Sequence, residues 1–214
     1  MSTDIWSRIG EAERSLSSGT RDGQPVRVLV VEKTYDAGRP DVWHALTTAS
    51  RIARWLAPVS GDLTVGGRYQ IEGNAGGTVL RCEEPDQLEI TWEYGGDVTW
   101  VLVTLTDAGD GTRLRLEHSA AVDQAKWDEF GPGAVGIGWE MALGGLRIHL
   151  ADPDWPGAEP DFADPGYPVF VRGSGEAWAV ADAASGTDAE EARAAAERCI
   201  AAYTAPPEAP SEAD

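Results

Sequence analysis

The sequence predicts an α+β protein in which a curved antiparallel sheet surrounds one long C-terminal helix, with extra helices at both ends. Two observations predict this class. Between residues 68 and 119, short segments of alternating apolar and polar residues are separated by turns rich in glycine or aspartate, as in consecutive antiparallel strands. A longer segment with apolar residues at helical spacing follows, and a helix of that length can cover one face of such a sheet.

The first 25 residues are predicted to form an amphipathic helix over Met1–Ser18 and a linker over Thr20–Pro25. The apolar residues of this segment recur at spacings of 4, 3 and 4: Ile5, Ile9, Ala12 and Leu16. That spacing places them on one side of a helix. We therefore expect a helical extension ahead of the main domain.

The main domain is predicted to begin with a strand at Val26–Lys33, because this segment is rich in β-branched residues. Pro40 suits the first turn of a short helix after that strand. Ser50 is placed to cap a second short helix, which Pro58 would end.

Five further strands are predicted at Arg68–Glu72, Thr78–Cys82, Leu88–Tyr94, Thr99–Thr106 and Thr112–Ser119. The short loops between them predict hairpins, and hence an antiparallel meander. Because side chains alternate between the two faces of a sheet, one face should be apolar and the other charged. The predicted apolar face consists of Leu88, Ile90, Trp92, Val101, Val103, Leu105, Leu114 and Leu116, with His118 at its end.

The long helix is predicted from an apolar stripe at spacings of 4, 4, 3 and 4: Val135, Trp139, Leu143, Leu146 and Leu150. Its interior glycines, Gly144 and Gly145, each weaken a helix by about 1 kcal/mol relative to alanine. We expect close packing on the sheet, or space left for a ligand, to compensate for them.

The chain after the long helix changes in composition. Ala151–Pro168 contains five prolines and is expected to run over the surface. Two helices are predicted at Ser174–Ala184 and Asp188–Tyr203, the second with a capping box that begins at Thr187. The expected organisation is an N-terminal helix and linker (residues 1–25), a main domain (26–150), a proline-rich segment and helical extension (151–204) and a disordered tail (205–214).

The composition argues against several classes of partner. The formal net charge is −19, and more than half of it lies after Leu150. Such a surface repels phosphate backbones and anionic membranes, so neither nucleic acid nor membrane is expected to bind. Cys82 and Cys199 lie in different segments and are expected to be reduced. The sequence begins without a signal-like leader and has no run of about 18 apolar residues, which favours a cytoplasmic protein.

No residue set in the sequence demands a particular reaction. Residues 131–136 match the letters G-x-G-x-x-G, but a dinucleotide site needs a buried strand before that loop, and Lys126–Phe130 is not such a strand. His44, His118 and His149 lack the companions of a metal site, so no metal or cofactor is predicted. The alternation points His118 inward, either as a satisfied core histidine or as a group that contacts a ligand or transfers a proton.

Nine tryptophans are present, and Trp92 and Trp139 fall on the inner surfaces of the predicted sheet and helix. They either pack a large aromatic core or line a cavity for an apolar or aromatic molecule. In the second case the expected wall is Leu88, Ile90, Trp92, Val101, Val103, Leu114, Leu116, His118, Trp139 and Leu143, with Trp55 and Tyr69 near the mouth.

Five short motifs carry a resemblance: residues 40–47 (Pro-Asp-Val-Trp-His-Ala-Leu-Thr), Ile52–Leu56, Thr91-Trp92, residues 111–118 and Gly138-Trp139-Glu140. Their order and spacing over about residues 26–150 resemble the START-like (SRPBCC) superfamily with its helix-grip fold. Within it, the chain looks like the bacterial homologues of heat-shock-protein-90 ATPase activators. Similar proteins are implicated in hydrophobic-ligand binding, aromatic polyketide cyclisation or stress responses. The eukaryotic activators add a separate chaperone-binding domain, which this sequence does not show.

Three hypotheses about function follow from the residues and the resemblance. The first is a protein that binds a hydrophobic small molecule between the sheet and the long helix. The second is an enzyme of the cyclase or hydratase kind, with His118 as its general acid or base. The third is an interaction or co-chaperone-like protein with a filled core, for which the terminal helices could form a homodimer.

Overall fold

A computed structural model describes residue 6 and residues 12–152, 154–155 and 162–205. Its strands are β1 (Glu13–Arg21), β2 (Gln24–Tyr35), β3 (Val59–Gly61), β4 (Arg68–Ile71), β5 (Gly76–Glu83), β6 (Gln87–Tyr94), β7 (Asp97–Ala108) and β8 (Gly111–Ala121). Its helices are α1 (Arg39–Thr47), α2 (Ala49–Trp55), α3 (Gln124–Phe130), α4 (Gly133–Ala151), α5 (Gly166–Ser185) and α6 (Ala189–Thr204).

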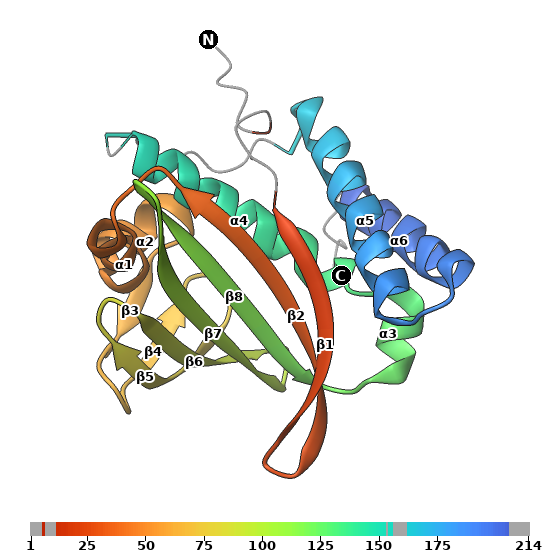
Figure 1. The fold of residues 1–214 in the computed structure, drawn as a ribbon, viewed down its shortest axis with the longest axis horizontal. Helices are drawn as coiled ribbons and strands as arrows, with labels where there is room; N and C mark the ends of the chain where they lie inside the picture. The colour runs from red at the N-terminus through yellow and green to blue at the C-terminus, as the bar shows by residue number, and fades with distance from the viewer. Residues whose placement is uncertain (1–5, 7–11, 153, 156–161, 206–214) are drawn as a thin grey trace, which may run out of the picture.

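The strands form one antiparallel sheet in the order β1-β2-β8-β7-β6-β5-β4-β3. The sheet is curved, and α4 lies along it, with α1 and α2 near one end and α3, α5 and α6 near the other (Figure 1). This arrangement confirms the predicted α+β class, in which a curved antiparallel sheet grips a long helix.

The N-terminal helix predicted over Met1–Ser18 is wrong from Glu13 onward, because Glu13–Ser18 belongs to β1. Strand β1 pairs along its whole length with β2, from Glu13 opposite Glu32 to Arg21 opposite Gln24. Arg14 and Leu16 are half-buried while Glu13, Ser15 and Ser17 are exposed, which is the period of a strand. Residues 1–5 and 7–11 of the predicted helix lie outside the described residues.

The linker predicted at Thr20–Pro25 is likewise the end of a hairpin. Asp22 and Gly23 join β1 to β2, and both have positive φ angles of 49° and 76°. Two such residues in succession suit the tight turn that matches the twist of paired strands. The sheet therefore includes residues that the sequence assigned to a separate extension.

The alternation of apolar and charged faces is confirmed by the register of the sheet. Val103 lies opposite Leu88 on one side and Leu116 on the other, so these three side chains form one row across the inner face. The outer face carries charged pairs, such as Arg113 with Glu32 at 2.6 Å. Because one face is apolar and the other charged, slipping the register by one residue would expose the core.

Glycines in α4 are compensated by close contacts between helices. A Cβ at Gly145 would lie 2.5 Å from the carbonyl oxygen of Trp55, at the end of α2. A Cβ at Gly136 would lie 2.2 Å from the ring of Trp178 in α5. These glycines are therefore closely packed, but their partners lie in other helices and not in the sheet that we expected.

The C-terminal helices form a lobe beside the sheet. Helix α5 begins at Gly166 instead of Ser174, inside the segment predicted to wander. The N-cap of α6 is Asp188, whose carboxylate accepts hydrogen bonds from the N–H groups of Glu190 and Glu191, so the capping box predicted at Thr187 is wrong. The Thr187 hydroxyl donates to Asp182 instead, at 2.8 Å.

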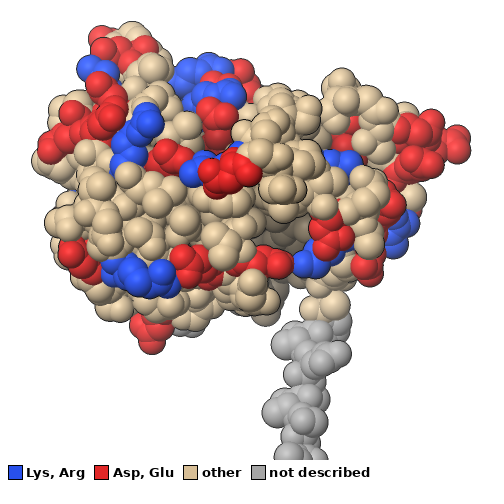
Figure 2. All heavy atoms as spheres, turned by 90° about the horizontal axis from the view of Figure 1, so that it is seen from below, with Lys and Arg blue, Asp and Glu red and all other residues tan. Residues whose placement is uncertain are grey.

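The surface carries both signs of charge. Acidic and basic side chains are interspersed on the face in Figure 2, which is hollowed where the sheet-bearing body meets the helical lobe. In the part of the chain that the structure describes, no helix is both long and apolar enough to cross a membrane. Cys82 and Cys199 are both free thiols, as expected.

Candidate functional site

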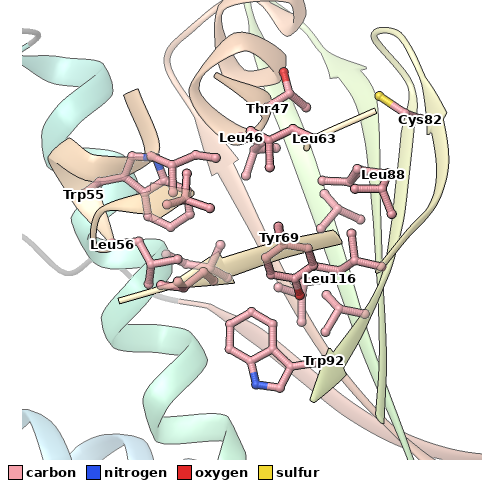
Figure 3. Close-up of a pocket in the computed structure, with 18 of the residues that line it drawn as sticks. Leu46, Thr47, Trp55, Leu56, Leu63, Tyr69, Cys82, Leu88, Trp92 and Leu116 are labelled. Atoms are coloured by element: carbon pink, nitrogen blue, oxygen red, sulfur yellow. The ribbon is translucent and has the colours of Figure 1, made fainter. Parts of the chain in front are cut away.

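An apolar cavity of about 100 Å³ lies between the inner face of the sheet, α4 and the two short helices α1 and α2. In Figure 3, Thr47 and Cys82 lie at one end of this cavity and Trp92 lies at the other. The sheet contributes Tyr69, Ile71, Val79, Cys82, Leu88, Ile90, Trp92, Val101, Val103, Leu114 and Leu116. Helix α4 contributes Trp139 and Leu143, and residues 46–63 contribute Leu46, Thr47, Ile52, Trp55, Leu56, Val59 and Leu63.

Two polar groups on this wall are already paired with the protein backbone. The Tyr69 hydroxyl donates to the Thr91 carbonyl at 2.7 Å, and the Trp55 indole N–H donates to the Ala45 carbonyl at 2.9 Å. Because a buried polar group without a partner costs free energy, these internal bonds leave a surface that favours apolar contacts. The Cys82 thiol is not activated, since partial burial and the charge of Glu84 raise its pKa.

The structure brings all the predicted wall residues to this cavity except His118. His118 lies opposite Val101, which does line the cavity, but the Trp139 indole covers the imidazole. The indole N–H donates to His118 Nδ1 at 2.8 Å. His118 instead lines a second hollow, which is formed by residues of β2, β7, β8 and the junction of α3 and α4.

His118 is held as a neutral hydrogen-bond acceptor. Its side chain is 7% exposed, and burial lowers the pKa of the imidazole to about 4. Since Nδ1 accepts from Trp139, the single ring proton at neutral pH is on Nε2. These surroundings match the first interpretation of His118, a histidine satisfied within the core.

Apart from Trp55, the sequence did not predict the part of the wall that comes from α1, α2 and β5. Leu46, Ile52 and Val79 are examples from these elements. The alternation of β4, where Tyr69 and Ile71 are buried between exposed neighbours, does indicate an inner face there. No local pattern, however, specifies that the short helices fold over that end of the sheet.

Two other classes of site can be considered for the described residues. In residues 12–152 and 162–205, no cluster of His, Cys, Asp and Glu side chains is arranged to hold a metal ion.

Helix α5 carries exposed apolar residues, Val169 at 72% and Val180 at 71%. A homodimer through the terminal helices stays a prediction, with these valines as positions that a partner could cover.

Comparison with known families gives a match over the middle of the chain. A model of the family described as Activator of Hsp90 ATPase homolog 1-like protein matches residues 36–151. This range is more than half of the chain, and it runs from the end of β2 to the end of α4. The two strands β1 and β2 and the C-terminal lobe lie outside it.

Solved structures show the same fold. The crystal structure of CalU16 from Micromonospora echinospora is 35% identical, covers 81% of this chain and 99% of that chain, and has a TM-score of 0.67. Protein MLL2253 from Mesorhizobium loti is 26% identical over 60% of this chain and 98% of its own, with a TM-score of 0.52. PFC0360w, an HSP90 activator from Plasmodium falciparum, is 21% identical over 58% and 96%, with a TM-score of 0.51. At that identity the likeness shows the fold alone. No curated protein matches the chain.

Proposed function

The chain belongs to the family of Activator of Hsp90 ATPase homolog 1-like proteins, and from that premise we propose that it binds a hydrophobic or aromatic small molecule between its sheet and α4. The observation that carries the proposal is the apolar cavity itself. Protein interiors are normally packed as densely as organic crystals, with few voids larger than one water molecule. A space of about 100 Å³ lined almost entirely by apolar side chains is therefore a feature to be explained.

The volume limits the size of the molecule. An engineered apolar cavity of about 150 Å³ stays dry and binds benzene. The space here is somewhat smaller, so it accepts about one ring without rearrangement. A ring that buries about 150 Å² gains roughly 4 kcal/mol, which corresponds to a dissociation constant near 1 mM. Tighter binding requires a larger ligand and movement of the wall.

The experiment is a titration with benzene, followed by the backbone amide signals in NMR spectra of the whole chain. Val79→Phe fills the cavity, because Val79 is a buried wall residue with 3% exposure. Leu80→Phe is the matched control, because Leu80 is the next residue on β5 and is 38% exposed. Thermal unfolding of both variants checks that they are folded.

We expect saturable binding near 1 mM in the wild type and in Leu80→Phe, with shifts concentrated on β6, β7, β8 and α4. Val79→Phe should bind at least tenfold more weakly, because the added ring occupies the space. Equal binding by Val79→Phe, or no saturable binding by the wild type, would overturn the proposal. If the wild type binds benzene as expected, native mass spectrometry of the protein from its own host would identify a natural ligand by its mass.

The other hypotheses have less support. An enzyme that uses His118 needs that group to reach the ligand, whereas the Trp139 indole lies between His118 and the cavity. Hsp90 activation enters only through the description of the family and through a structure that shares the fold at 21% identity. Neither observation favours these roles over ligand binding.

A further inference from the structure

The second hollow, with a volume of about 330 Å³, lies where β2, β7 and β8 meet the junction of α3 and α4. Part of its lining is a patch of four residues on one face of the sheet: Arg27 and Leu29 of β2, and His118 and Ala120 of β8. Leu29 lies opposite His118 and Arg27 lies opposite Ala120, so Arg27 and His118 are diagonal neighbours. Long side chains at such positions can contact the same molecule.

The Arg27 guanidinium has no negatively charged partner among the described residues. It stacks on the Trp127 ring at 4.1 Å, and its Nη2 donates to the neutral amide of Gln124 at 2.9 Å. Its Nη1 is buried and makes no hydrogen bond with the part of the chain that the structure describes. A guanidinium carries five N–H donors, so most of them are unused here. Because an unpaired buried donor is unfavourable, Arg27 favours an acceptor in the hollow that it lines.

His118 supplies a second donor to the same space. Its Nδ1 accepts the Trp139 N–H, so the proton of the neutral imidazole is on Nε2. Within the described residues, no group accepts a hydrogen bond from Nε2. The side chain is 7% exposed and lines the hollow, and this N–H is therefore available to a molecule placed there. Two donors that need an acceptor thus share one space.

The start of α4 adds a third feature that favours an anion. Pro132, Ala134 and Val135 line the hollow, and α4 begins without a side-chain cap. The N-terminus of a helix carries a partial positive charge and unpaired N–H groups. An oxyanion in the hollow is therefore attracted by the helix as well as by Arg27.

The remaining walls of the hollow are largely apolar. Val98, Val122 and Val135 line it and are 49%, 43% and 41% exposed, and Leu29 and the Trp127 ring add further apolar surface. Burial of such surface favours a molecule with an apolar body. The space is roughly twice that of a cavity that holds one benzene molecule, so a body of about two rings fits.

The acidic groups of the hollow do not supply the missing partner of Arg27. Asp97 and Asp123 both line it, but they lie 2.9 Å and 3.8 Å from the Lys126 ammonium. The Asp123 carboxylate also caps α3 by accepting from the backbone N–H of Lys126. These three side chains are at least half exposed, so water and salt screen their charges.

We propose that this hollow is a second binding site, and that it takes an organic carboxylate with an apolar body, such as an aromatic acid. The carboxylate accepts hydrogen bonds from the Arg27 guanidinium and from His118 Nε2, and the apolar body packs on Trp127 and the exposed valines. A carboxylate suits the planar fork of an arginine better than a neutral amide does. The hollow and the apolar cavity have no lining residue in common, so this site goes beyond the proposed function and does not rest on it.

The experiment compares two probes of nearly equal shape, 2-naphthoate and 2-naphthamide, by calorimetric titration of the whole chain at neutral pH. Only the first is an anion. Arg27→Met removes the guanidinium and keeps an apolar stem. Arg21→Met is the matched control, because Arg21 also stacks on a tryptophan, Trp100 at 4.6 Å, but is paired with Glu89 and lies outside the hollow.

The wild type and Arg21→Met should bind 2-naphthoate roughly tenfold more tightly than 2-naphthamide, because only the anion forms charged hydrogen bonds. This preference opposes the net charge of −19, which repels anions. Arg27→Met should lose the preference. His118→Phe, which removes the Nε2 donor, should bind 2-naphthoate about threefold more weakly. Equal binding of the two probes by the wild type, or an unchanged preference in Arg27→Met, would overturn the proposal.

Two variants at the rim decide the matter if Arg27→Met does not fold. Val135 lies in the first turn of α4 and is 41% exposed, a position where glutamate suits the helix. Val135→Glu should weaken the binding of 2-naphthoate about fivefold by repulsion between like charges, and should leave 2-naphthamide unchanged. Val135→Gln, of the same shape, should affect neither probe. Equal effects of the two substitutions on 2-naphthoate would contradict a carboxylate site.

The site and the proposed function can fail separately. Val79→Phe fills the first cavity, so it should weaken benzene binding and leave 2-naphthoate binding unchanged. The backbone amide signals that 2-naphthoate shifts in NMR spectra should lie on β2, β8 and the junction of α3 and α4. Displacement of 2-naphthoate by benzene would place the acid in the first cavity and overturn this site alone. No binding of 2-naphthoate to the wild type would also overturn it, whatever the result with benzene.

Discussion

Two cations beneath α4, the half-buried Arg14 and the buried Lys33, differ in how the fold satisfies them. Arg14 donates two hydrogen bonds of 2.6 Å to the carboxylate of Glu140, which is 2% exposed. Lys33 is 4% exposed, and its Nζ makes no hydrogen bond with the described residues. Burial lowers the pKa of Lys33 to about 8, although the charge of Glu140 opposes the shift. Glu140 is thus paired with Arg14, and Lys33 makes no hydrogen bond to that carboxylate.

Lys33→Met should therefore stabilise the protein at neutral pH. Because the pKa of Lys33 is lower in the folded chain, the unfolded chain binds this proton more tightly, and the charge costs about 3 kcal/mol below pH 8. Methionine removes that cost and keeps the apolar stem, so we expect the free energy of unfolding to rise by about 1–3 kcal/mol at pH 7. Urea unfolding at pH 7 and pH 9.5 measures it.

The gain in the free energy of unfolding should shrink as the pH rises from 8 to 10.5. Over this range the amine is neutral in the folded chain and progressively loses its proton in the unfolded chain. Lys126→Met is the control, because the Lys126 side chain is 67% exposed and its ion pairs are on the surface. Such pairs contribute about 0–1 kcal/mol. A lower stability of Lys33→Met would mean that its attraction to Glu140 outweighs the loss of hydration.

His118 shows how far the sequence can predict a single residue of the site. Alternation along β8 correctly predicted that the imidazole points inward, because that period is a property of the strand itself. Its partner is Trp139, which lies on α4, and the strand pattern holds no information about which helical side chain will cover it. The inner faces were therefore predictable, and the pairing of His118 with Trp139 was not.

At the scale of elements, local pattern succeeded where apolar residues recur in the sequence with the period of a strand or a helix. The long strands β6, β7 and β8 and the helix α4 were predicted because each has one apolar face. Helix α3 was missed because none of its residues is buried, so it has no apolar period. Strand β1 was read as a helix because its structure depends on pairing with β2, which is not a local property.

The contact between α4 and α5 leads to a prediction about glycine. Alanine normally stabilises a helix interior by about 1 kcal/mol relative to glycine. Gly136→Ala should do the opposite, because the added Cβ would lie 2.2 Å from the buried ring of Trp178. We expect a loss of about 1–3 kcal/mol from overpacking, measured by urea unfolding.

Gly173→Ala is the matched control in the neighbouring helix. Gly173 is an exposed interior residue of α5, and a Cβ there would meet nothing within 4 Å. This variant should gain about 0.5–1 kcal/mol from helix propensity alone. Equal effects of the two substitutions would mean that α4 and α5 are not packed as closely as the structure has them.

At the scale of the whole molecule, the C-terminal lobe shares its core with the sheet-bearing part. Trp178 of α5 is fully buried against α4. Helix α6 is tied to the same region, because the Tyr203 hydroxyl donates to the Ala134 carbonyl at 2.9 Å and Arg198 donates to the Glu129 carbonyl at 2.7 Å. Helix α4 therefore packs against the lobe on one side and lines the cavity on another.

Trp178→Ala should consequently destabilise the entire protein. Removing a fully buried tryptophan costs about 3–5 kcal/mol, and the shared core predicts one unfolding transition at a lower denaturant concentration. Circular dichroism and tryptophan fluorescence should report the same midpoint, as two-state unfolding requires. Val180→Ala, at a position 71% exposed on the same helix, should change stability by less than about 0.5 kcal/mol. Two separate transitions, with the sheet surviving the first, would show that the lobe folds independently. Cooperative loss would mean that the lobe fixes the position of α4, and with it the Trp139 wall of the cavity.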